Sequence, residues 1–179
     1  ADKKEEVKAD WNIFAAQVED EYHVTDTNMQ WALGSCEAQD VMPEKVSDNL
    51  INALQAVDNG VFAMCQDEEL AWMVETSSNV ASVQSEAGKV VIVSSQRSNV
   101  TSNLTNICNT VKATYELAGA DVEQTDGYPA WQPKHGSELQ RIVKEAYKKL
   151  FGKEPVVRGI HAGLECGLFS EKYPDLDMV

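Results

Sequence analysis

The sequence lacks the features that mark several large classes of protein. Its 179 residues hold four cysteines, none of them in a C-x-x-C pair, and no apolar run approaches the roughly 18 residues of a membrane-spanning helix. No charged and then apolar leader opens the chain. We therefore expect a cytoplasmic protein with reduced thiols and no membrane partner.

Positive charge is also scarce. The chain has 15 Lys and Arg against 29 Asp and Glu, a net charge of -14. A nucleic acid or an anionic membrane surface as partner would require clustered cations, so both are disfavoured. Solubility alone is a sufficient reason for the acidity. The hydrophobic content of 43% is enough to bury a core, in one domain or one and a fraction.

Apolar residues spaced by three and four predict four helices. The first follows Asp2 and ends near Tyr22, and the second lies between Pro43 and Gly60. The third covers Ser102–Leu117. The fourth begins after Ser137, a capping residue, and ends at Gly152.

Runs rich in β-branched and alternating apolar residues predict six strands. They cover Met29–Cys36, Val61–Cys65, Val80–Ser85, Lys89–Ser95, Val122–Thr125 and Val156–Ile160. The third and fourth flank Glu86-Ala87-Gly88 and should form a hairpin. The fold class is therefore α+β, with helices packed on a mainly antiparallel sheet, followed by a helix and strand of an α/β domain.

Breaker residues at 132–137 predict a domain boundary, which we place between residues 131 and 132. The chain begins at Ala1 without an initiator Met, and it ends at Leu176–Val179, which resembles the opening of a buried strand. These ends indicate a piece of a longer protein.

The run His161–Gly167 follows the last predicted strand and combines two glycines with three polar or reactive side chains. Ligands of open α/β sheets bind beyond the carboxyl ends of strands, which favours a binding loop here. Glu165 is a candidate acceptor for an ammonium group, and His161 for binding or moving a proton. The alternative is a glycine-capped turn with a surface Glu165 and a hydrogen-bonded His161.

Two residues of the predicted hairpin are further candidates. Arg97 ends a strand that has no other cation after Lys89, and its guanidinium suits bidentate capture of a carboxylate. The alternative for Arg97 is an ordinary surface charge or ion pair. Asn79 can offer an amide to a ligand or simply mark a turn at the strand entry.

No catalytic centre is evident from spacing. The histidines at 23, 135 and 161 stand in separate segments without a paired ligand, and Cys166 lacks the context of a cysteine hydrolase. No serine lies in a G-x-S-x-G motif. We therefore assign no catalytic residue and no metal ligand to this chain.

Several motifs resemble those of one known family. They are Thr76-Ser77-Ser78-Asn79-Val80, Arg97-Ser98, Gly127-Tyr128-Pro129-Ala130-Trp131-Gln132-Pro133, Ile160 to Phe169, Tyr173-Pro174 and Asp177-Met178-Val179. In this order they resemble the aminoacyl-histidine dipeptidases, the Xaa-His or cytosol non-specific dipeptidases of the zinc exopeptidase family. The resemblance runs from the first predicted helix to the last residue, and 161–167 is its most specific part.

The resemblance implies a parent enzyme with two metal ions (zinc, or cobalt or manganese) in a catalytic domain. It also implies an inserted lid domain that binds the dipeptide substrate and forms a homodimer. Residues 1–131 match the later part of the lid, and 132–179 match a catalytic-domain piece without the metal ligands. By the same resemblance, Arg97 holds the substrate carboxylate, Asn79 contacts substrate from the lid, and Glu165 and His161 line the pocket.

Three hypotheses follow. The first is a metallodipeptidase that hydrolyses Xaa-His and other dipeptides with metal-activated water, of which this chain is an inactive fragment without bound metal. The second is a free-standing α+β module for ligand binding or dimerisation. The third, a complete small enzyme with Cys166 as nucleophile, is the least favoured.

Overall fold

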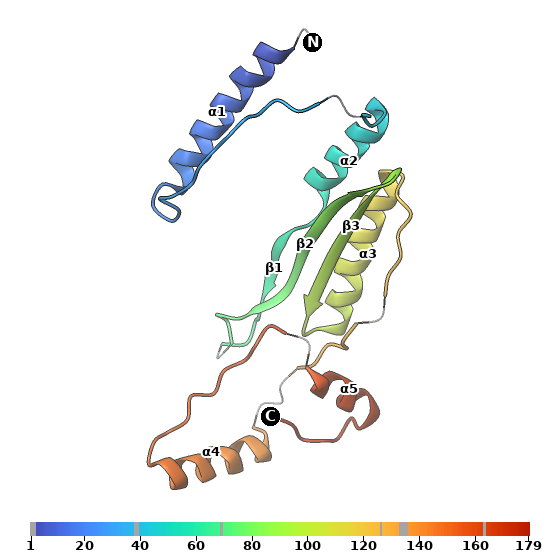
Figure 1. Cartoon of the computed structure of the whole chain (residues 1–179). Coiled ribbons are helices and arrows are strands. Elements are labelled where there is room, and N and C mark those ends of the chain that lie inside the picture. The colour runs from blue at the N-terminus through green and yellow to red at the C-terminus, as the bar shows by residue number, and fades with distance from the viewer. Residues whose placement is uncertain (1–2, 38–39, 69, 126, 133–135, 163) are drawn as a thin grey trace. The chain divides into compact units, whose positions relative to one another are not determined.

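The computed structural model describes residues 3–37, 40–68, 70–125, 127–132, 136–162 and 164–179. These residues form five helices and one three-stranded sheet (Figure 1). The helices are α1 (Lys4–Tyr22), α2 (Glu44–Ala56), α3 (Thr101–Leu117), α4 (Glu138–Phe151) and α5 (Glu165–Lys172). The strands are β1 (Gly60–Met64), β2 (Val74–Glu86) and β3 (Lys89–Ser98). The expected α+β class with an antiparallel sheet is therefore confirmed.

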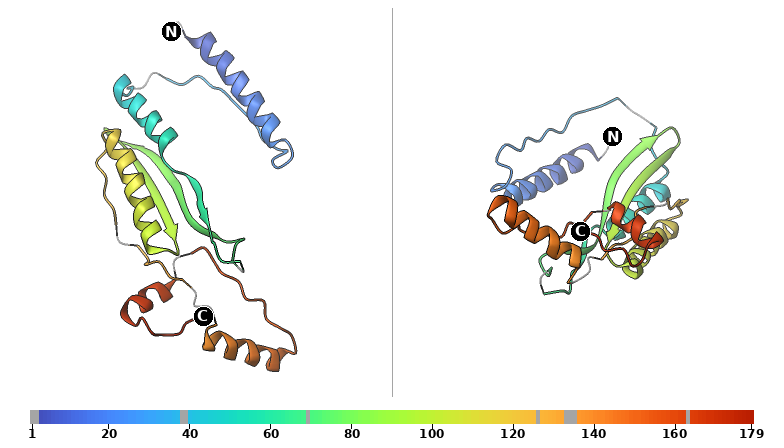
Figure 2. Two further views of the ribbon diagram at one scale, coloured as in Figure 1. Left: turned by 180° about the vertical axis from the view of Figure 1, so that it is seen from behind. Right: turned by 90° about the horizontal axis from the view of Figure 1, so that it is seen from below.

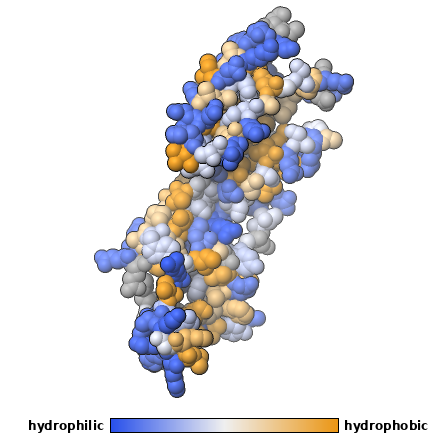
Figure 3. Space-filling view, turned by 60° about the vertical axis from the view of Figure 1, so that its left-hand side comes forward, coloured by the Kyte–Doolittle hydropathy of each residue, from blue (hydrophilic) through white to orange (hydrophobic). Residues whose placement is uncertain are grey.

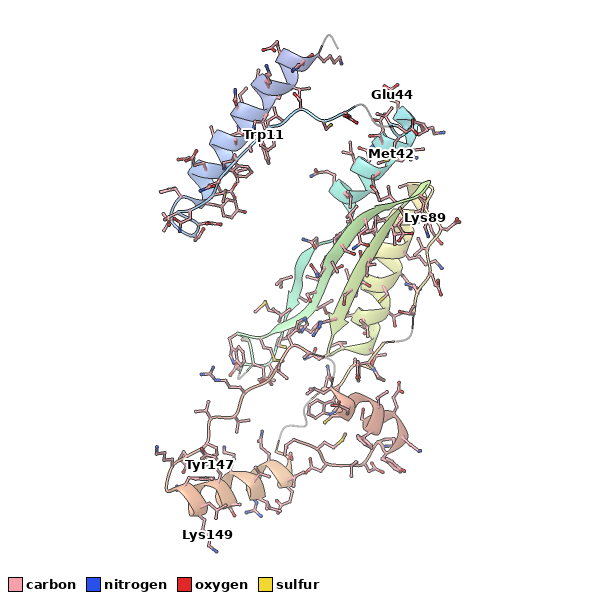
Figure 4. All side chains as sticks on the ribbon, in the orientation of Figure 1. Trp11, Met42, Glu44, Lys89, Tyr147 and Lys149 are labelled. Carbon is pink, nitrogen blue, oxygen red and sulfur yellow. The ribbon has the colours of Figure 1, made fainter. Side chains whose placement is uncertain are left out.

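The chain divides into two compact units, Ala1–Met42 and Pro43–Val179. The first holds α1 and the extended segment that follows it. Trp31 of that segment contacts Trp11 and Phe14 of α1, with ring centroids 6.0 and 6.2 Å apart; Figure 4 labels Trp11 on α1. Asp2, the expected helix cap, lies outside the described residues. The unit is thus held together by an aromatic cluster, and no residue of α1 is buried.

In the second unit, the sheet has the order β1-β2-β3 with both pairs antiparallel. The predicted hairpin between β2 and β3 is confirmed: Glu86 pairs with Lys89, and Gly88 has a φ of 77°, which a residue with a Cβ adopts only with strain. A bulge between Val80 and Ser82 interrupts the register. β2 is the central strand, paired along part of its length on both sides.

Helix α3 covers one face of the sheet, as the view from behind in Figure 2 shows. The core lies between the helices and that face; its buried members are Ala53, Val57, Val111 and Tyr115, with Val80 and Ile92 of the sheet packed against them. Tyr115 also makes a 2.8 Å hydrogen bond to Ser94 of β3 through its hydroxyl. The opposite face of the sheet has no helix against it among the described residues.

Helix α4 is joined to the end of the chain through its first turn. Ser137 accepts a hydrogen bond from the Gln140 amide at 3.0 Å, and Asp177 accepts one from the Leu139 amide at 2.9 Å. Its apolar side chains are largely exposed, and Figure 4 shows Tyr147 and Lys149 on different sides of the helix. Figure 3 likewise shows hydrophobic side chains interspersed with hydrophilic ones on the surface. No helix in the described ranges is long and apolar enough to cross a membrane.

Three of the six predicted strands are wrong. Residues 29–36, 122–125 and 156–160 are not in a ladder in the structure, whereas the strand predicted at 61–65 is confirmed as β1. A strand requires a partner for its amides and carbonyls, and none of these segments has one among the described residues. The expected domain boundary at 131/132 falls inside the second unit, and Pro133–His135 lie outside the described residues.

Candidate functional site

The uncovered face of the sheet, which we call the open face, carries a group of uncharged polar side chains around one cation. Ser77 pairs with Arg97 and Asn79 pairs with Ser95 in the β2–β3 ladder. Side chains two residues apart on a strand share a face, so Arg97 and Asn79 are diagonal neighbours there. Ser78, which lies between Ser77 and Asn79 on β2, is buried on the helix-covered face. The register therefore brings together two residues that the sequence marked separately.

His161 contacts the open face at two points. Its Nε2 lies 2.7 Å from the Ser77 hydroxyl, and its backbone carbonyl accepts a 3.4 Å hydrogen bond from the Arg97 guanidinium. Ser77 and Arg97 are opposite each other in the ladder, so both contacts fall on a single cross-strand pair. The segment that returns from α4 is thereby attached to the sheet beside Arg97.

The surroundings of His161 favour its neutral form. Burial lowers the pKa of the imidazole below its ordinary value, and the nearby Arg97 charge lowers this pKa further. A backbone hydrogen bond with Val74 acts in the opposite direction. The net lowering of this pKa disfavours a second positive charge beside the Arg97 guanidinium.

Arg97 itself is exposed and makes no ion pair with a carboxylate of the described residues. Neither residues 76–85 nor residues 90–96 contain a charged side chain, although the whole chain carries a net charge of -14. The alternative of an ordinary ion-paired surface arginine thus finds no partner in this part of the structure. The open face presents a cation with free donors, the requirement for binding a carboxylate.

Glu165 is exposed and is the first residue of α5. The run 161–167 was predicted as a loop throughout; instead its second half is helical, and Gly163 lies outside the described residues. Gly167 is buried because the helix approaches another segment closely: a Cβ at Gly167 would lie 2.4 Å from the Pro129 carbonyl oxygen. The glycine thus serves packing of α5 against Pro129. No hydrogen bond or ion pair joins Glu165 to the open face among the described residues.

Ser77 is the residue that sequence reasoning missed. It stands inside the Thr76–Val80 motif, two positions from Asn79, and the alternation of side chains along a strand places both on one face. That alternation was the available signal. Its contact with His161, 84 residues later, depends on tertiary structure.

The described residues contain no group of three or more His, Cys, Asp or Glu side chains that could hold a metal ion. The His161 ring is engaged with Ser77, and the four cysteines are free thiols, of which Cys36 is exposed and only Cys65 is buried. Burial raises the pKa of the Cys108 thiol. This set of donors does not fit a pair of metal ions, so we derive no metal-dependent step from it.

Comparison with known proteins points to one group of enzymes. No protein-family model matches the chain. It is 35% identical over 181 aligned residues, its whole length, to the cytosol non-specific dipeptidase of Escherichia coli strain K12, of which it covers 37%. It also matches the crystal structure of aminoacylhistidine dipeptidase from Vibrio alginolyticus, with a TM-score of 0.85 and 31% identity, over 99% of this chain and 36% of that one.

The chain therefore spans a little over a third of the length of the relatives it matches. The similarity covers the whole chain and extends to the fold. The resemblance to the aminoacyl-histidine dipeptidases is confirmed, and it covers this chain from end to end.

Proposed function

We propose that this chain is part of a metal-dependent dipeptidase and that it supplies substrate-binding residues. Residues 1–131 form the later part of a lid domain, and residues 132–179 belong to the catalytic domain. The observation that carries the proposal is Arg97: it lies on the open face, beside His161 and without an ion pair to a described carboxylate. Similarity of the whole chain to two dipeptidases supports it.

A dipeptide is a zwitterion, so its two ends require opposite charges. The Arg97 guanidinium binds the terminal carboxylate through two parallel hydrogen bonds. Asn79, diagonal to Arg97 on the open face, donates its amide to the same end of the substrate. Glu165, exposed at the start of α5, accepts a hydrogen bond from the terminal ammonium group. His161 lines the pocket between them.

The hydrolytic step belongs to other parts of the longer protein. Two metal ions, zinc or else cobalt or manganese, supply activated water and polarise the scissile carbonyl when bound there. The residues of this chain bind the two ends of the dipeptide and orient the peptide bond. We therefore expect residues 1–179 alone to hydrolyse nothing and the longer protein to act on Xaa-His and other dipeptides, as a homodimer formed through the lid.

The test compares two proteins in one assay: the longer protein and residues 1–179, each with an Xaa-His dipeptide, with and without a chelator. We expect hydrolysis by the longer protein, its loss with the chelator and its return when zinc, cobalt or manganese is added back. We expect no hydrolysis by residues 1–179 under any of these conditions.

Two results would contradict the proposal. If the longer protein hydrolyses no dipeptide, the free-standing binding or dimerisation module becomes the better account of the open face. If residues 1–179 hydrolyse a dipeptide alone, the catalytic group must lie in this chain. In that case, loss of activity in the Cys166→Ala variant would identify the thiol as nucleophile.

A further inference from the structure

Glu75 is the only charged residue that is buried in the part of the chain that the structure describes. It is 8% exposed, and no ion pair joins it to a cation of the described residues. Removing a carboxylate from water is unfavourable unless hydrogen bonds compensate for the lost hydration. An apolar side chain would be easier to bury in this place, so the role of Glu75 depends on what its hydrogen bonds hold.

The Glu75 carboxylate joins β2 to the first turn of α3. Its Oε1 accepts hydrogen bonds from the Asn103 side-chain amide at 2.6 Å and from the Thr76 hydroxyl at 3.2 Å. Asn103 is the third residue of α3, and the helix begins after Val100 without a side-chain cap. The positive end of the helix dipole favours a carboxylate beside this turn. Glu75 therefore ties the start of α3 to the sheet.

Further hydrogen bonds extend this network to the end of β3. The Thr76 hydroxyl lies 2.8 Å from that of Ser98, the last residue of β3, and the Ser98 hydroxyl accepts a hydrogen bond from the Val100 amide at 3.1 Å. The Glu75 carbonyl accepts one from the Asn99 amide at 3.2 Å. The backbone and the side chain of Glu75 thus both hold the short link between β3 and α3.

Arg97 lies directly beside this network. It precedes Ser98, and its pair with Ser77 is the second from that end of the β2–β3 ladder. The ends of strands open locally more readily than their centres, because fewer neighbours hold them. The contacts of Glu75 close the ladder just beyond Arg97. They therefore limit the movement of the backbone from which the guanidinium extends.

Two chemical roles for Glu75 fit these contacts less well. A general base must reach the substrate, but Glu75 is buried and its Oε1 already accepts two hydrogen bonds from within the chain. A metal ligand would need companions, and the described residues contain no group of three or more His, Cys, Asp or Glu side chains that could hold a metal ion. A purely structural role would affect the whole fold, whereas a positioning role acts through Arg97.

We infer that Glu75 is a positioning residue for the Arg97 guanidinium. Through Asn103 and Thr76 it fixes the end of β3 against α3, so that Arg97 meets the substrate carboxylate in the orientation for two parallel hydrogen bonds. The inference rests on the proposed function. Loss of the tie frees the end of β3 and weakens dipeptide binding, while the hydrolytic step proceeds as before once the substrate is bound.

The tie itself is tested in residues 1–179 by nitrogen-15 relaxation of the backbone amides. Asn103→Ala removes the donor to Glu75 from an exposed position of α3. Asn106→Ala is the matched control, because Asn106 is also exposed and its side chain makes no hydrogen bond among the described residues. The order parameter of the Arg97 amide should fall from about 0.85, the value of a rigid backbone, in Asn103→Ala only. An unchanged order parameter in Asn103→Ala would overturn the inference.

The effect on substrate binding is tested by dipeptide kinetics of the longer protein. Asn103→Ala and Glu75→Ala should each raise KM about tenfold, the effect of one hydrogen bond to a charged group, with kcat nearly unchanged. Glu75→Gln keeps an acceptor oxygen for Asn103 and should raise KM only about threefold, because a neutral acceptor bonds more weakly. Asn106→Ala should match the unsubstituted protein. A loss in kcat with KM unchanged, or no change at all in Asn103→Ala, would contradict the positioning role.

A double-variant cycle separates positioning from a general loss of structure. If Glu75 acts through Arg97, Asn103→Ala should lower kcat/KM about tenfold in the unsubstituted protein and hardly at all in the Arg97→Met variant. An equal loss in both backgrounds would overturn the positioning role and leave the proposed function standing.

Failure of the proposed function gives a different result. A longer protein without any dipeptidase activity would overturn the proposed function and the positioning role together. The relaxation of the Arg97 amide in residues 1–179 would still decide whether the network of Glu75 holds the end of β3.

Discussion

The two faces of one sheet differ in what their side chains do. On the helix-covered face, alternate residues of β2 and β3 pack under α3 or bond to it, as Ser94 does with Tyr115. On the open face, the intervening residues carry Arg97 and hold His161 from outside the sheet. The same two strands therefore supply a buried core on one face and, on our proposal, a substrate-binding surface on the other, one residue apart. Substitutions on the two faces should separate these effects.

The largest effect on stability should come from the helix-covered side. Ile107 of α3 is 1% exposed, and Ile107→Ala should lower the free energy of unfolding by about 3 kcal/mol through lost burial and the cavity left behind. Urea unfolding followed by circular dichroism measures it. Ile51→Ala on α2, where the side chain is 59% exposed, is the control and should change the free energy by about 0.5 kcal/mol or less. Equal losses in both variants would contradict this assignment of the core.

A smaller effect should follow from filling the close approach between α5 and Pro129. Gly167→Ala places a Cβ 2.4 Å from the Pro129 carbonyl oxygen and should cost about 2 kcal/mol of unfolding free energy, because backbone must shift. Gly34→Ala is the matched control, since no atom lies within 4 Å of its added Cβ. A Gly167→Ala protein as stable as the control would show that this packing is absent in solution.

The bond from Ser94 to Tyr115 offers a finer test of the helix-covered face. Tyr115→Phe and Ser94→Ala should each cost about 1 kcal/mol, and the double variant should cost less than their sum, because both remove one hydrogen bond. Thermal or urea unfolding of all four proteins gives the coupling energy. Strictly additive losses would mean that the bond does not form.

The smallest effect concerns pH and the open face. The folded-state pKa of His161 lies below its unfolded value of about 6.5, so the unfolded chain binds more protons between these two values. Its contribution to stability is therefore present above about pH 6.5 and lost as pH falls through the folded-state pKa. NMR titration should show the lowered pKa, and Arg97→Met should raise it by removing a nearby positive charge. The same pKa with and without Arg97 would contradict the contact.

Local signals in the sequence were sufficient for much of the fold. Gly88 between two β-rich runs located the hairpin, and Ser137 with Gly152 located both ends of α4. The prediction of strands failed where the presence of a pairing strand decides the outcome. Residues 29–36, 122–125 and 156–160 have the composition of strands but no pairing strand among the described residues. Propensity specifies what fits a pleated surface and leaves open whether a second strand is present.

The candidate site was predictable residue by residue and not as a constellation. Arg97 and His161 were marked by their chemistry and by family resemblance, 64 residues apart. Their contact depends on the β2–β3 register, which the bulge between Val80 and Ser82 shifts, and on the path of the segment after α4. Ser77 had no marked chemistry of its own. It became visible only when the structure placed its hydroxyl on the His161 ring.

The central claim is that the open face binds the substrate carboxylate through Arg97, and it is tested most directly by dipeptide kinetics of the Arg97→Met variant of the longer protein. We predict a fall in kcat/KM of about 100-fold, expressed mainly in KM, with only partial recovery in Arg97→Lys because the fork geometry is lost. Lys89→Met, on the same strand and paired with Glu86, should leave kcat/KM unchanged. A dipeptide KM that is the same in Arg97→Met as in the unsubstituted protein would contradict the account.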